Sequence, residues 1–312
     1  MHTPHHTAEP DLLSKSLFDS AFSDKDRYLF RLTEATKFLS NWLPTQPNVY
    51  CLFGSGINGD LNILSEQKEL NFSDIPGFPT TSVDGHVGKF VYGVIDGQTI
   101  LIQQGRLHLY EGFAAYDAVF PTRVVANLGV KRFILTNAVG SLDLNLEPGS
   151  IVVLSNILAG QMPEPFVGMS HNSLGTLFSD CTTPFDEAWS LVVQKILENH
   201  DISTSRGTFA WMMGPRYDSA AEIADLQARA YIISNVLKKP HLAPCVIGMS
   251  MAPEVVALNH LGNNKVIGLS FVSNYAAGVS SDPLSHEQVL AFGREFSVKF
   301  IPALGDVLRT KN

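Results

Sequence analysis

A guanidinium and an imidazole stand two residues apart in the run Gly105-Arg106-Leu107-His108-Leu109-Tyr110-Glu111-Gly112. If the strand predicted before this run keeps its geometry, both side chains point to one face, because side chains alternate along a strand. An arginine fork beside an imidazole donor suits the oxygens of a phosphate or sulfate group. Glu111 lies just beyond, within reach for orienting His108. A structural Arg–Glu pair at a surface turn explains the run equally well, so both interpretations stay open.

Two further loops supply backbone donors after predicted strands. Gly54-Ser55-Gly56 follows a short apolar run and offers N–H groups and a hydroxyl, the ingredients of an anion-binding nest. Thr136-Asn137-Ala138-Val139-Gly140 offers more N–H groups after another apolar run. The first loop also fits ordinary turn chemistry, and it is not a P-loop because no Gly-Lys-Ser/Thr follows it.

Two later loops carry side chains that suit recognition of an organic ligand. Gly248-Met249-Ser250-Met251-Ala252-Pro253-Glu254 places the Ser250 hydroxyl before a predicted helix, where it also fits an N-cap. Phe271-Val272-Ser273-Asn274-Tyr275 ends a predicted strand with an amide. An amide both donates and accepts, as recognition of a heterocycle edge requires. Taken alone, Asn274 fits a turn residue as well.

Short apolar runs alternate with helical periodicity along most of the chain. Strands are predicted over residues 49–53, 99–103, 132–136, 151–154, 207–213, 245–247 and 266–271. Helices are predicted over residues 113–128, 186–197, 219–230, 255–261 and 287–308. A capping box of Ser285 and Gln288 begins the last helix and places His286 in its first turn. The alternation indicates an α/β fold with a mainly parallel sheet that is covered on both faces.

One domain is the simplest account of this organisation, because no stretch has the composition of a linker or an internal repeat. We expect residues 1–25 to form an N-terminal tail and first-helix region, and residues 26–312 to form a single catalytic domain. The His-rich start fits a solvated tail better than a metal site. Residues 160–184 are the longest stretch without periodicity, and so long a loop in a compact domain is usually functional or disordered.

The composition limits which classes of partner and which cellular compartment are expected. The net charge of -8 over 312 residues argues against nucleic acid or an anionic membrane surface as the main partner, but not against a small anion in a locally positive pocket. No window approaches the roughly 20 apolar residues of a membrane span, and no secretory signal is visible. Cys51, Cys181 and Cys245 lie far apart without a CxxC pair, which favours a reducing, cytoplasmic location and no thiolate metal site.

Taken together, these segments resemble the trimeric purine nucleoside phosphorylases of the nucleoside phosphorylase family. The similarity runs from about Val49 to the last helix. Besides the five loops above, it is carried by Ile75-Pro76-Gly77-Phe78-Pro79, His86-Val87-Gly88-Lys89 and Gly214-Pro215-Arg216-Tyr217. The order and spacing of all these segments are far more specific than any one loop. The resemblance implies a single-domain α/β fold with a mixed, mainly parallel, partly barrel-like sheet.

The resemblance also implies roles for individual residues. The phosphate-binding positions are Ser55, His86, Arg106, His108, Ser250 and the backbone of Ala138. The nucleoside-binding positions are Tyr110, Tyr217, Asp218, Met249, Asn274 and His286. The catalytic positions among these are His86, His108 and Asn274. The resemblance further implies a homotrimer that uses phosphate as a co-substrate and needs no metal and no other cofactor.

The nucleoside-binding residues are expected to contact different parts of the nucleoside. Tyr110 and Met249 pack on the ribose, and Tyr217 stacks on the purine. Asn274 faces the purine N7 and 6-oxo group, where a donor stabilises the leaving purine anion. His286 meets the ribose 5′-hydroxyl. His86, by contrast, belongs to a mobile loop near the phosphate.

Two departures from the family pattern bear on the purine. Asp218 stands where the 6-oxopurine enzymes have a Glu that grips N1–H, and Glu222 is a less suitable substitute one turn later. Arg216 resembles the 5′-methylthioadenosine phosphorylases, which carry Asp at the position of Asn274 and a small apolar residue at that of His286. Asn274 and His286 therefore favour a 6-oxopurine nucleoside with a free 5′-hydroxyl.

A third departure is the stretch 160–184, which is shorter than the family pattern. In the family this region helps build the trimer interface and lends a Phe to the neighbouring site. Phe166 and Phe178 are both available for that role, and the sequence does not choose between them. The loop Ile57-Asn58-Gly59-Asp60 after Ser55 is also atypical.

The sequence thus predicts reversible phosphorolysis of 6-oxopurine ribonucleosides and deoxyribonucleosides, such as inosine and guanosine, to the free base and a pentose 1-phosphate. Phosphorolysis of 5′-methylthioadenosine or adenosine is the alternative. A nucleoside hydrolase and a non-catalytic nucleoside-binding protein fit less well, because binding alone does not need the site of the nucleophile.

Overall fold

The computed structural model describes residues 23–54, 57, 61–80, 88–169, 171, 174–262, 264–281 and 286–310. Of the expected site residues, Ser55 and His86 lie outside these ranges. His286 is described only as the first residue of a helix, and the expected cap Ser285 before it lies outside the described residues.

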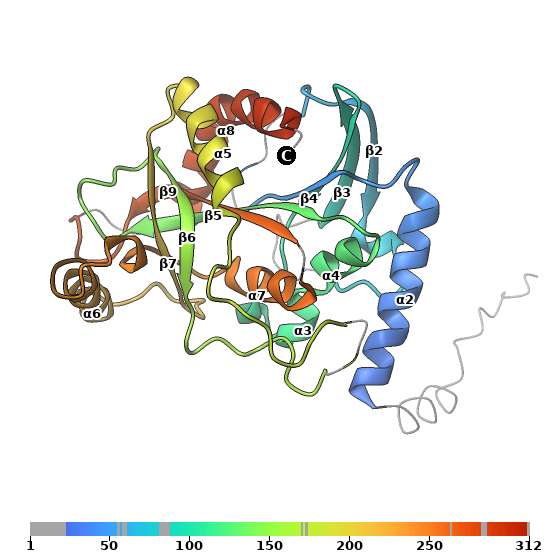
Figure 1. The fold of residues 1–312 in the computed structure, drawn as a ribbon, viewed down its shortest axis with the longest axis horizontal. Helices are drawn as coiled ribbons and strands as arrows, with labels where there is room; N and C mark the ends of the chain where they lie inside the picture. Colours follow the sequence, from blue (N-terminus) through green and yellow to red (C-terminus); the bar gives the residue numbers. More distant parts are fainter. Residues whose placement is uncertain are drawn as a thin grey trace, which may run out of the picture.

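Within these ranges, nine strands form one sheet (Figure 1). They are β1 (Val49–Leu52), β2 (Ser65–Asn71), β3 (Lys89–Ile95), β4 (Gln98–Gln104), β5 (Arg132–Ser141), β6 (Ile151–Leu158), β7 (Thr204–Trp211), β8 (Pro244–Gly248) and β9 (Lys265–Tyr275). Their order in the sheet is β2-β3-β4-β1-β5-β8-β7-β6-β9.

The second half of the sheet closes on itself. Because β9 also pairs with β5, the strands β5, β8, β7, β6 and β9 form a ring, and β1 to β4 extend from it as an open wing. Five of the strand pairings are parallel and four are antiparallel. The expected α/β fold with a mixed, mainly parallel, partly barrel-like sheet is confirmed.

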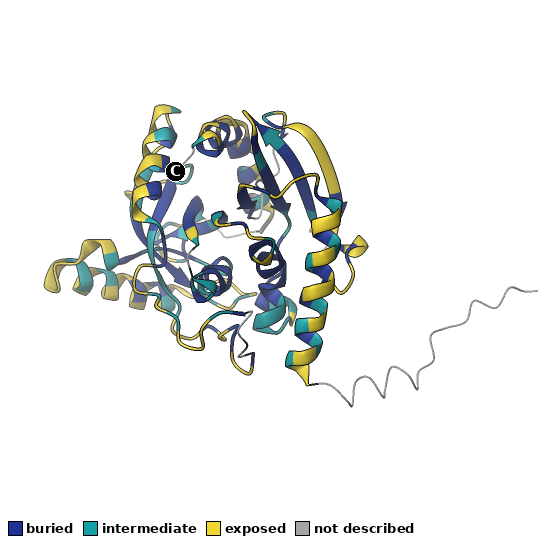
Figure 2. Ribbon diagram, turned by 45° about the vertical axis from the view of Figure 1, so that its right-hand side comes forward, coloured by how far each residue is buried: buried dark blue, intermediate teal, exposed yellow. Residues whose placement is uncertain are grey.

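Helices cover both faces of the sheet (Figure 1). They are α2 (Asp24–Trp42), α3 (Ala115–Ala118), α4 (Phe120–Asn127), α5 (Glu187–Asn199), α6 (Ala220–Tyr231), α7 (Ala252–Leu261) and α8 (His286–Arg309). The side chains of β1 alternate between two cores: Tyr50 and Leu52 pack with α2, α4 and α7, whereas Val49 and Cys51 pack with α5 and α8. Figure 2 shows the resulting pattern, with buried strands between helices whose outer faces are exposed.

Most elements were predicted from the sequence, but four points need correction. The helix predicted over 113–128 is two helices, because the chain departs from helical geometry at Val119, where α4 begins with Pro121 near its N-terminus. The predicted loops at Asn137–Gly140 and Ser273–Tyr275 are strand, because β5 and β9 pair in parallel as far as Ser141 and Tyr275. The helix α2 lies almost entirely beyond residues 1–25, where a first helix was expected, and the strands β2 and β3 were not predicted.

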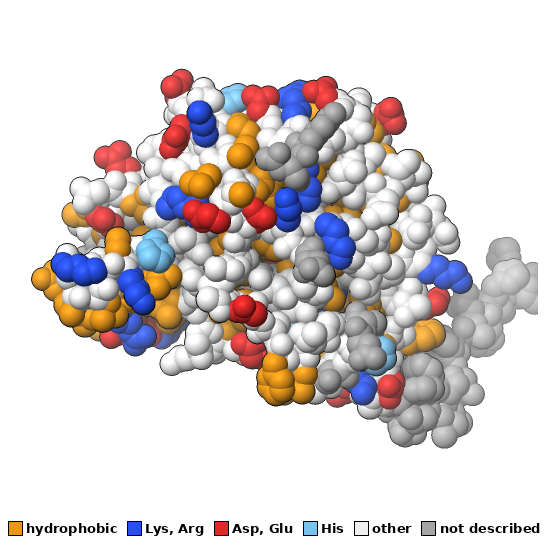
Figure 3. Space-filling view, in the orientation of Figure 1, with side chains coloured by type: hydrophobic (Ala, Val, Ile, Leu, Met, Phe, Trp, Pro, Cys, Tyr) orange, Lys and Arg blue, Asp and Glu red, His pale blue; other side chains and the backbone are white. Residues whose placement is uncertain are grey.

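The surface carries both signs of charge. On the face seen in Figure 3, acidic and basic side chains are interspersed. Exposed apolar side chains gather at the end of α6, where Tyr231, Ile232, Val236 and Leu237 are each about half exposed or more. In the described part of the chain, no helix combines the length and the apolarity needed to cross a membrane.

The loop after β1 fits tightly against β5, and this contact yields a stability prediction. A Cβ atom at Gly54 would lie 2.6 Å from the Asn137 Cα and 2.8 Å from the Thr136 carbonyl oxygen, so the backbone would have to shift. We expect Gly54→Ala to lower the free energy of unfolding by about 1–3 kcal/mol, as overpacking does in other cores. Denaturant unfolding measures the change.

The matched control is Gly160→Ala, because nothing lies within 4 Å of the Cβ position there. We expect it to change the free energy of unfolding by less than about 0.5 kcal/mol. Equal losses in the two variants would contradict the close approach of the Gly54 loop to β5.

Candidate active site

A pocket opens where β5, β8 and β9 end, between α6 and the run that follows β4. It brings together residues that are up to 181 positions apart in the chain, from His108 to Val289. Eight of the expected site residues line it: His108, Tyr110, Ala138, Tyr217, Asp218, Met249, Ser250 and Asn274. Its apolar wall includes Ile223 of α6, Ile247 of β8 and Val289 of α8, none of which was predicted as a site residue.

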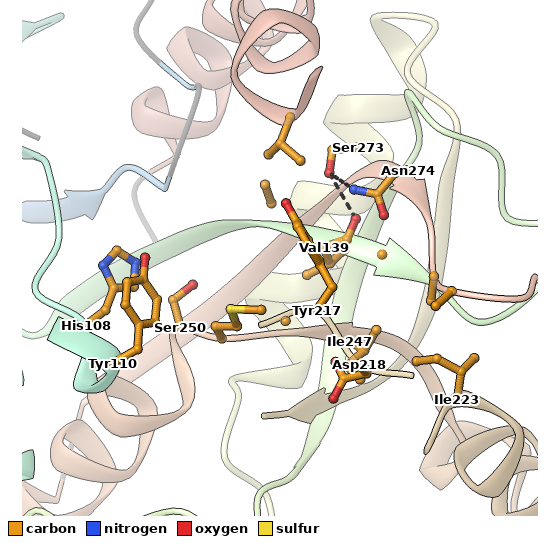
Figure 4. A pocket seen from close by; sticks show the side chains of 17 residues that line it. His108, Tyr110, Val139, Tyr217, Asp218, Ile223, Ile247, Ser250, Ser273 and Asn274 are labelled. Atoms are coloured by element: carbon orange, nitrogen blue, oxygen red, sulfur yellow. Dashed lines mark hydrogen bonds between the residues drawn. The ribbon is translucent and has the colours of Figure 1, made fainter. Parts of the chain in front are cut away.

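The polar groups of the pocket fall at two ends (Figure 4). His108, Tyr110 and Ser250 lie together at one end, and Ser273 and Asn274 lie at the other. Tyr217 lies between the two groups. Such a pocket, mostly apolar and with a few convergent polar groups, is the usual form of a small-molecule site.

His108 is held by Glu111, as predicted. The Glu111 carboxylate accepts both from the His108 backbone N–H, at 2.9 Å, and from the ring Nδ1, at 3.0 Å. Both side chains are buried, and the imidazole stacks on Tyr110 with 4.6 Å between ring centroids. The bond to the carboxylate fixes the ring orientation. Burial raises the pKa of Tyr110 to about 12, so its phenol stays neutral.

Arg106 is buried behind the pocket and is not one of its lining residues. Its Nε donates to the Glu254 carboxylate at 2.7 Å, and its Nη1 donates to the Thr136 carbonyl at 2.9 Å. Within the described residues its Nη2 is buried and has no hydrogen-bond partner. A buried guanidinium edge without an acceptor fits an anionic ligand, because leaving such donors unpaired is costly.

The structure corrects two interpretations of this run. The strand geometry does not persist to His108, because β4 ends at Gln104 and Gly105 adopts a φ of +84°. The surface pair of Arg106 with a nearby Glu is also wrong, because the partner is the buried Glu254, 148 residues away.

The loop after β1 is tied to the same region. The Gly54 N–H donates to the Thr136 hydroxyl at 2.9 Å, and that hydroxyl donates to the Leu52 carbonyl at 3.2 Å. Thr136 therefore connects the start of this loop with Arg106, which bonds the Thr136 carbonyl. Ser55 is the next residue, but it lies outside the described residues.

Ser250 stands at a strained turn before α7. Met251 has φ +70° and ψ -46°, and the Ala252 N–H donates to the Ser250 carbonyl at 2.9 Å, which makes a tight three-residue turn. A non-glycine residue in this region is strained, and such strain is typical of functional sites. The N-cap interpretation of Ser250 is wrong, because Met251 is the N-cap and no side chain caps this helix. The Ser250 hydroxyl lines the pocket instead.

Asn274 is oriented by its neighbour at the other end. The Ser273 hydroxyl donates to the Val139 carbonyl at 3.2 Å, so its oxygen is the acceptor of the bond from the Asn274 amide nitrogen, at 3.0 Å (Figure 4). The Asn274 Oδ1 lies over Gly140, 3.1 Å from where a Cβ atom would be. One N–H and the carbonyl oxygen of the amide are left for a ligand.

Asp218 lines the pocket at a half-buried position. Burial raises the pKa of its carboxyl, and the nearby Glu222 raises it further. Glu222 itself caps α6 through Ser219 and forms a two-fold ion pair with the exposed Arg216, at 2.7 and 2.8 Å. Glu222 is thus already engaged, and neither it nor Arg216 is among the lining residues.

The two phenylalanines of the stretch 160–184 differ sharply. Phe166 is buried, stacks on His260, and lies under the buried Arg123, with 4.2 Å from the guanidinium to the ring. Phe178 is 89% exposed. Only Phe178 of these two is available for contact with another molecule.

Glu254 is the main polar residue of this region that the sequence analysis did not identify. It was visible as part of the loop Gly248–Glu254, but nothing local to it indicates its bond to Arg106. Within the part of the chain that the structure describes, no group of three or more His, Cys, Asp or Glu side chains is arranged to hold a metal ion.

Residues 49–309 match the family model described as the phosphorylase superfamily. The chain is 30% identical over 278 residues to purine nucleoside phosphorylase 1 of Geobacillus stearothermophilus, covering 89% of this chain and 96% of that protein.

Solved structures agree with the sequence match. The crystal structure of Schistosoma mansoni purine nucleoside phosphorylase in complex with inosine superposes with a TM-score of 0.80 and 25% identity, covering 90% of this chain and 96% of that one. The crystal structure of isoform 2 of purine nucleoside phosphorylase from Schistosoma mansoni, in complex with cytosine and ribose-1-phosphate, superposes with a TM-score of 0.78 and 27% identity. The match covers 90% of this chain and 96% of that one.

Proposed function

The chain belongs to the phosphorylase superfamily and is an enzyme of the purine nucleoside phosphorylase type, and we propose that its preferred substrates are 6-oxopurine nucleosides such as inosine and guanosine. The observation that carries the proposal is the Asn274 amide at the end of the pocket opposite His108 and Ser250. The products are the free purine and ribose 1-phosphate or deoxyribose 1-phosphate.

The end formed by His108, Ser250 and the backbone of Ala138 holds the attacking phosphate. The Nη2 edge of Arg106 approaches the phosphate from behind, and Ser55 and His86 complete the group in this proposal. The support is that, among the described residues, neither nearby glutamate lines the pocket: Glu111 bonds the Nδ1 of His108, and Glu254 bonds the Nε of Arg106. A charge-assisted guanidinium N–H donor and a hydroxyl suit phosphate oxygens.

Asn274 and Asp218 bind the purine, and Tyr217 stacks on it. Cleavage of the N-glycosidic bond gives the sugar oxocarbenium character and leaves negative charge on the purine. The remaining N–H of Asn274 stabilises that charge at N7 or O6, and one such preorganised donor is typically worth about 3–4 kcal/mol in the transition state. Tyr110 and Met249 pack on the ribose between the two ends, and His286 meets its 5′-hydroxyl. Holding phosphate and nucleoside together supplies much of the remaining rate enhancement.

The competing activities are separated by one assay over a small panel. Inosine, guanosine, adenosine and 5′-methylthioadenosine are each incubated with and without phosphate. We expect phosphate-dependent release of hypoxanthine and guanine. Release that persists without phosphate would identify a hydrolase, and no release from any nucleoside would identify a binding protein. A preference for adenosine or 5′-methylthioadenosine would overturn the 6-oxopurine assignment.

The residue that favoured 5′-methylthioadenosine as the substrate lies outside the pocket. This residue is Arg216, and in the structure its side chain is exposed and bonded to Glu222. Arg216 is not one of the residues that line the pocket.

We propose that the reaction needs no metal and no cofactor, with phosphate as a co-substrate, and we expect EDTA to leave the rate unchanged.

We also propose a cytoplasmic location, which the three free cysteines Cys51, Cys181 and Cys245 support. Nucleic acids and membranes are not expected partners, in keeping with the net charge of -8.

We propose a homotrimer in which Phe178 of one subunit reaches the site of the next. The support is its 89% exposure, since large apolar side chains are rarely left this exposed without a partner. We expect sedimentation at the mass of three chains, and a several-fold rise in nucleoside KM for Phe178→Ala. Val298→Ala is the control, because Val298 is similarly exposed, at 80%, on α8. A monomer with full activity would contradict the assembly.

The raised pKa of Asp218 predicts how kcat/KM for inosine falls on the acidic side of its pH profile. Burial and Glu222 disfavour its ionised form, so its pKa lies above the usual value of about 3.9 for Asp. The ionised carboxylate is a stronger acceptor for the purine N1–H than the neutral acid, so kcat/KM for inosine is expected to fall as pH drops through this raised pKa. Measurement of kcat/KM between pH 4 and pH 8 locates the limb.

Asp218→Asn is the control for this assignment. An amide does not titrate in this range, so the limb should disappear in the variant. An acidic limb that persists unchanged in Asp218→Asn would assign it to another group.

A further inference from the structure

Glu254 and Arg106 form a buried ion pair at the back of the pocket. Their side chains are 4% and 3% exposed, and the Glu254 Oε1 accepts from the Arg106 Nε at 2.7 Å. The pair connects two loops that both reach the phosphate end of the pocket. Arg106 follows β4, and Glu254 lies in the first turn of α7, four residues after Ser250.

Two hydrogen bonds of Arg106 fix the plane of its guanidinium. The hydrogen bond from Nε to Glu254 fixes the position of one nitrogen, and the hydrogen bond from Nη1 to the Thr136 carbonyl fixes the position of a second. A rigid planar group held at two points has no freedom to rotate about its long axis. Its Nη2, buried and without a partner among the described residues, is therefore presented in one direction.

We propose that Glu254 is a positioning residue for phosphate: by accepting from Nε it orients Arg106 so that Nη2 is the nitrogen left available to the anion. This inference rests on the proposed phosphate site. Glu254 is not among the residues that line the pocket, and its proposed effect on phosphate passes through Arg106. What matters in this proposal is the position of the carboxylate oxygen that accepts from Arg106. The negative charge of Glu254 works against phosphate binding, because it offsets part of the attraction that Arg106 exerts on an anion.

Two conservative variants separate the place of the oxygen from its charge. Glu254→Gln keeps an acceptor oxygen in the same place and removes the charge. Glu254→Asp keeps the charge and withdraws the oxygen by one methylene. Positioning predicts that the aspartate variant is the more harmful of the two, whereas a role based on charge alone predicts the reverse order.

The probe is inorganic phosphate, with its Kd measured by titration calorimetry for the wild type and both variants. We expect Glu254→Asp to weaken phosphate binding about 10-fold, the loss of one charge-assisted hydrogen bond, and Glu254→Gln to change it less than about 3-fold. In steady-state assays the phosphate KM should follow the same order, and the inosine KM should stay within about 2-fold. A purely structural role would move both KM values together.

The outcomes are distinct. Equal or greater loss in Glu254→Gln, or parallel changes in the inosine KM, would overturn the positioning role, as would a wild type that does not bind phosphate. A wild type that binds phosphate but cleaves no nucleoside would refute the proposed function alone, since the order of the two Kd values would still test Glu254.

Discussion

Asn274→Asp is expected to shift the ratio of kcat/KM for inosine over adenosine by on the order of 100-fold toward adenosine, which corresponds to ~2.7 kcal/mol between the two transition states. An amide at this position has an N–H to donate to the 6-oxo group of inosine. A carboxylate has only acceptors, which suit the 6-amino group of adenosine and repel the electrons of a 6-oxo group.

The hydrogen bonds around Asn274 sharpen this expectation. The Ser273 hydroxyl gives its proton to the Val139 carbonyl, so it receives the bond from the Asn274 amide. An aspartate cannot donate that bond, and the hydroxyl would have to turn toward it and leave Val139. The aspartate variant should therefore lose activity on inosine more than it gains activity on adenosine.

Two controls accompany this measurement. Asn274→Ala should lower kcat/KM for both nucleosides, because it removes the donor and the acceptor together. Ser273→Ala should lower inosine turnover by a smaller factor without changing the preferred base, because the amide loses its support but keeps its chemistry. If Asn274→Asp left the inosine-to-adenosine ratio unchanged, the assignment of Asn274 to base recognition would be wrong.

The sequence predicted the elements with strong local signals. Apolar runs such as Val49–Leu52 are parallel strands covered on both faces, so every residue is buried and the run stands out. The strand β2 gave no such signal, because it pairs only with β3 at the edge of the sheet and five of its first six residues are exposed. The ends of β5 and β9 contain Asn137, Gly140 and Asn274, which are typical of turns, but the ladder between these two strands overrides that local preference.

The site was predicted as a set of loops, and the contacts between them came only from the structure. The bond between His108 and Glu111 spans three residues, so its partners are visible in one short run. The bond between Arg106 and Glu254 spans 148 residues, and either residue taken alone fits a surface position. Burial is what distinguishes the two cases, and burial is a property of the folded chain.

That buried pair determines how the loss of Arg106 must be tested. Arg106→Ala leaves the Glu254 carboxylate buried without a cation, and breaking a buried pair in this way typically destabilises a protein by about 3–5 kcal/mol. A loss of activity in the single variant would therefore mix unfolding with loss of phosphate binding. The double variant Arg106→Met/Glu254→Leu removes both charges, and replacing a buried pair with apolar side chains of similar size is often close to neutral.

We expect the double variant to recover most of the stability that Arg106→Ala loses, and to recover none of the phosphate binding. Without the guanidinium, kcat/KM for phosphate should fall by on the order of 100-fold, as expected for truncating one partner of a buried charged contact. Chemical denaturation measures the first effect, and phosphate saturation curves with inosine measure the second.

Arg132→Met is the matched control for the loss of a partly buried arginine. Arg132 bonds Thr310 and Gln98 and stacks on Trp189, none of which lines the pocket. Its loss should lower stability and leave the phosphate KM unchanged, because in the proposed site the guanidinium of Arg106, and not that of Arg132, bonds the anion. Normal phosphate use in Arg106→Met/Glu254→Leu would mean that His108 and Ser250 hold the phosphate without Arg106, and that the buried pair serves the fold alone.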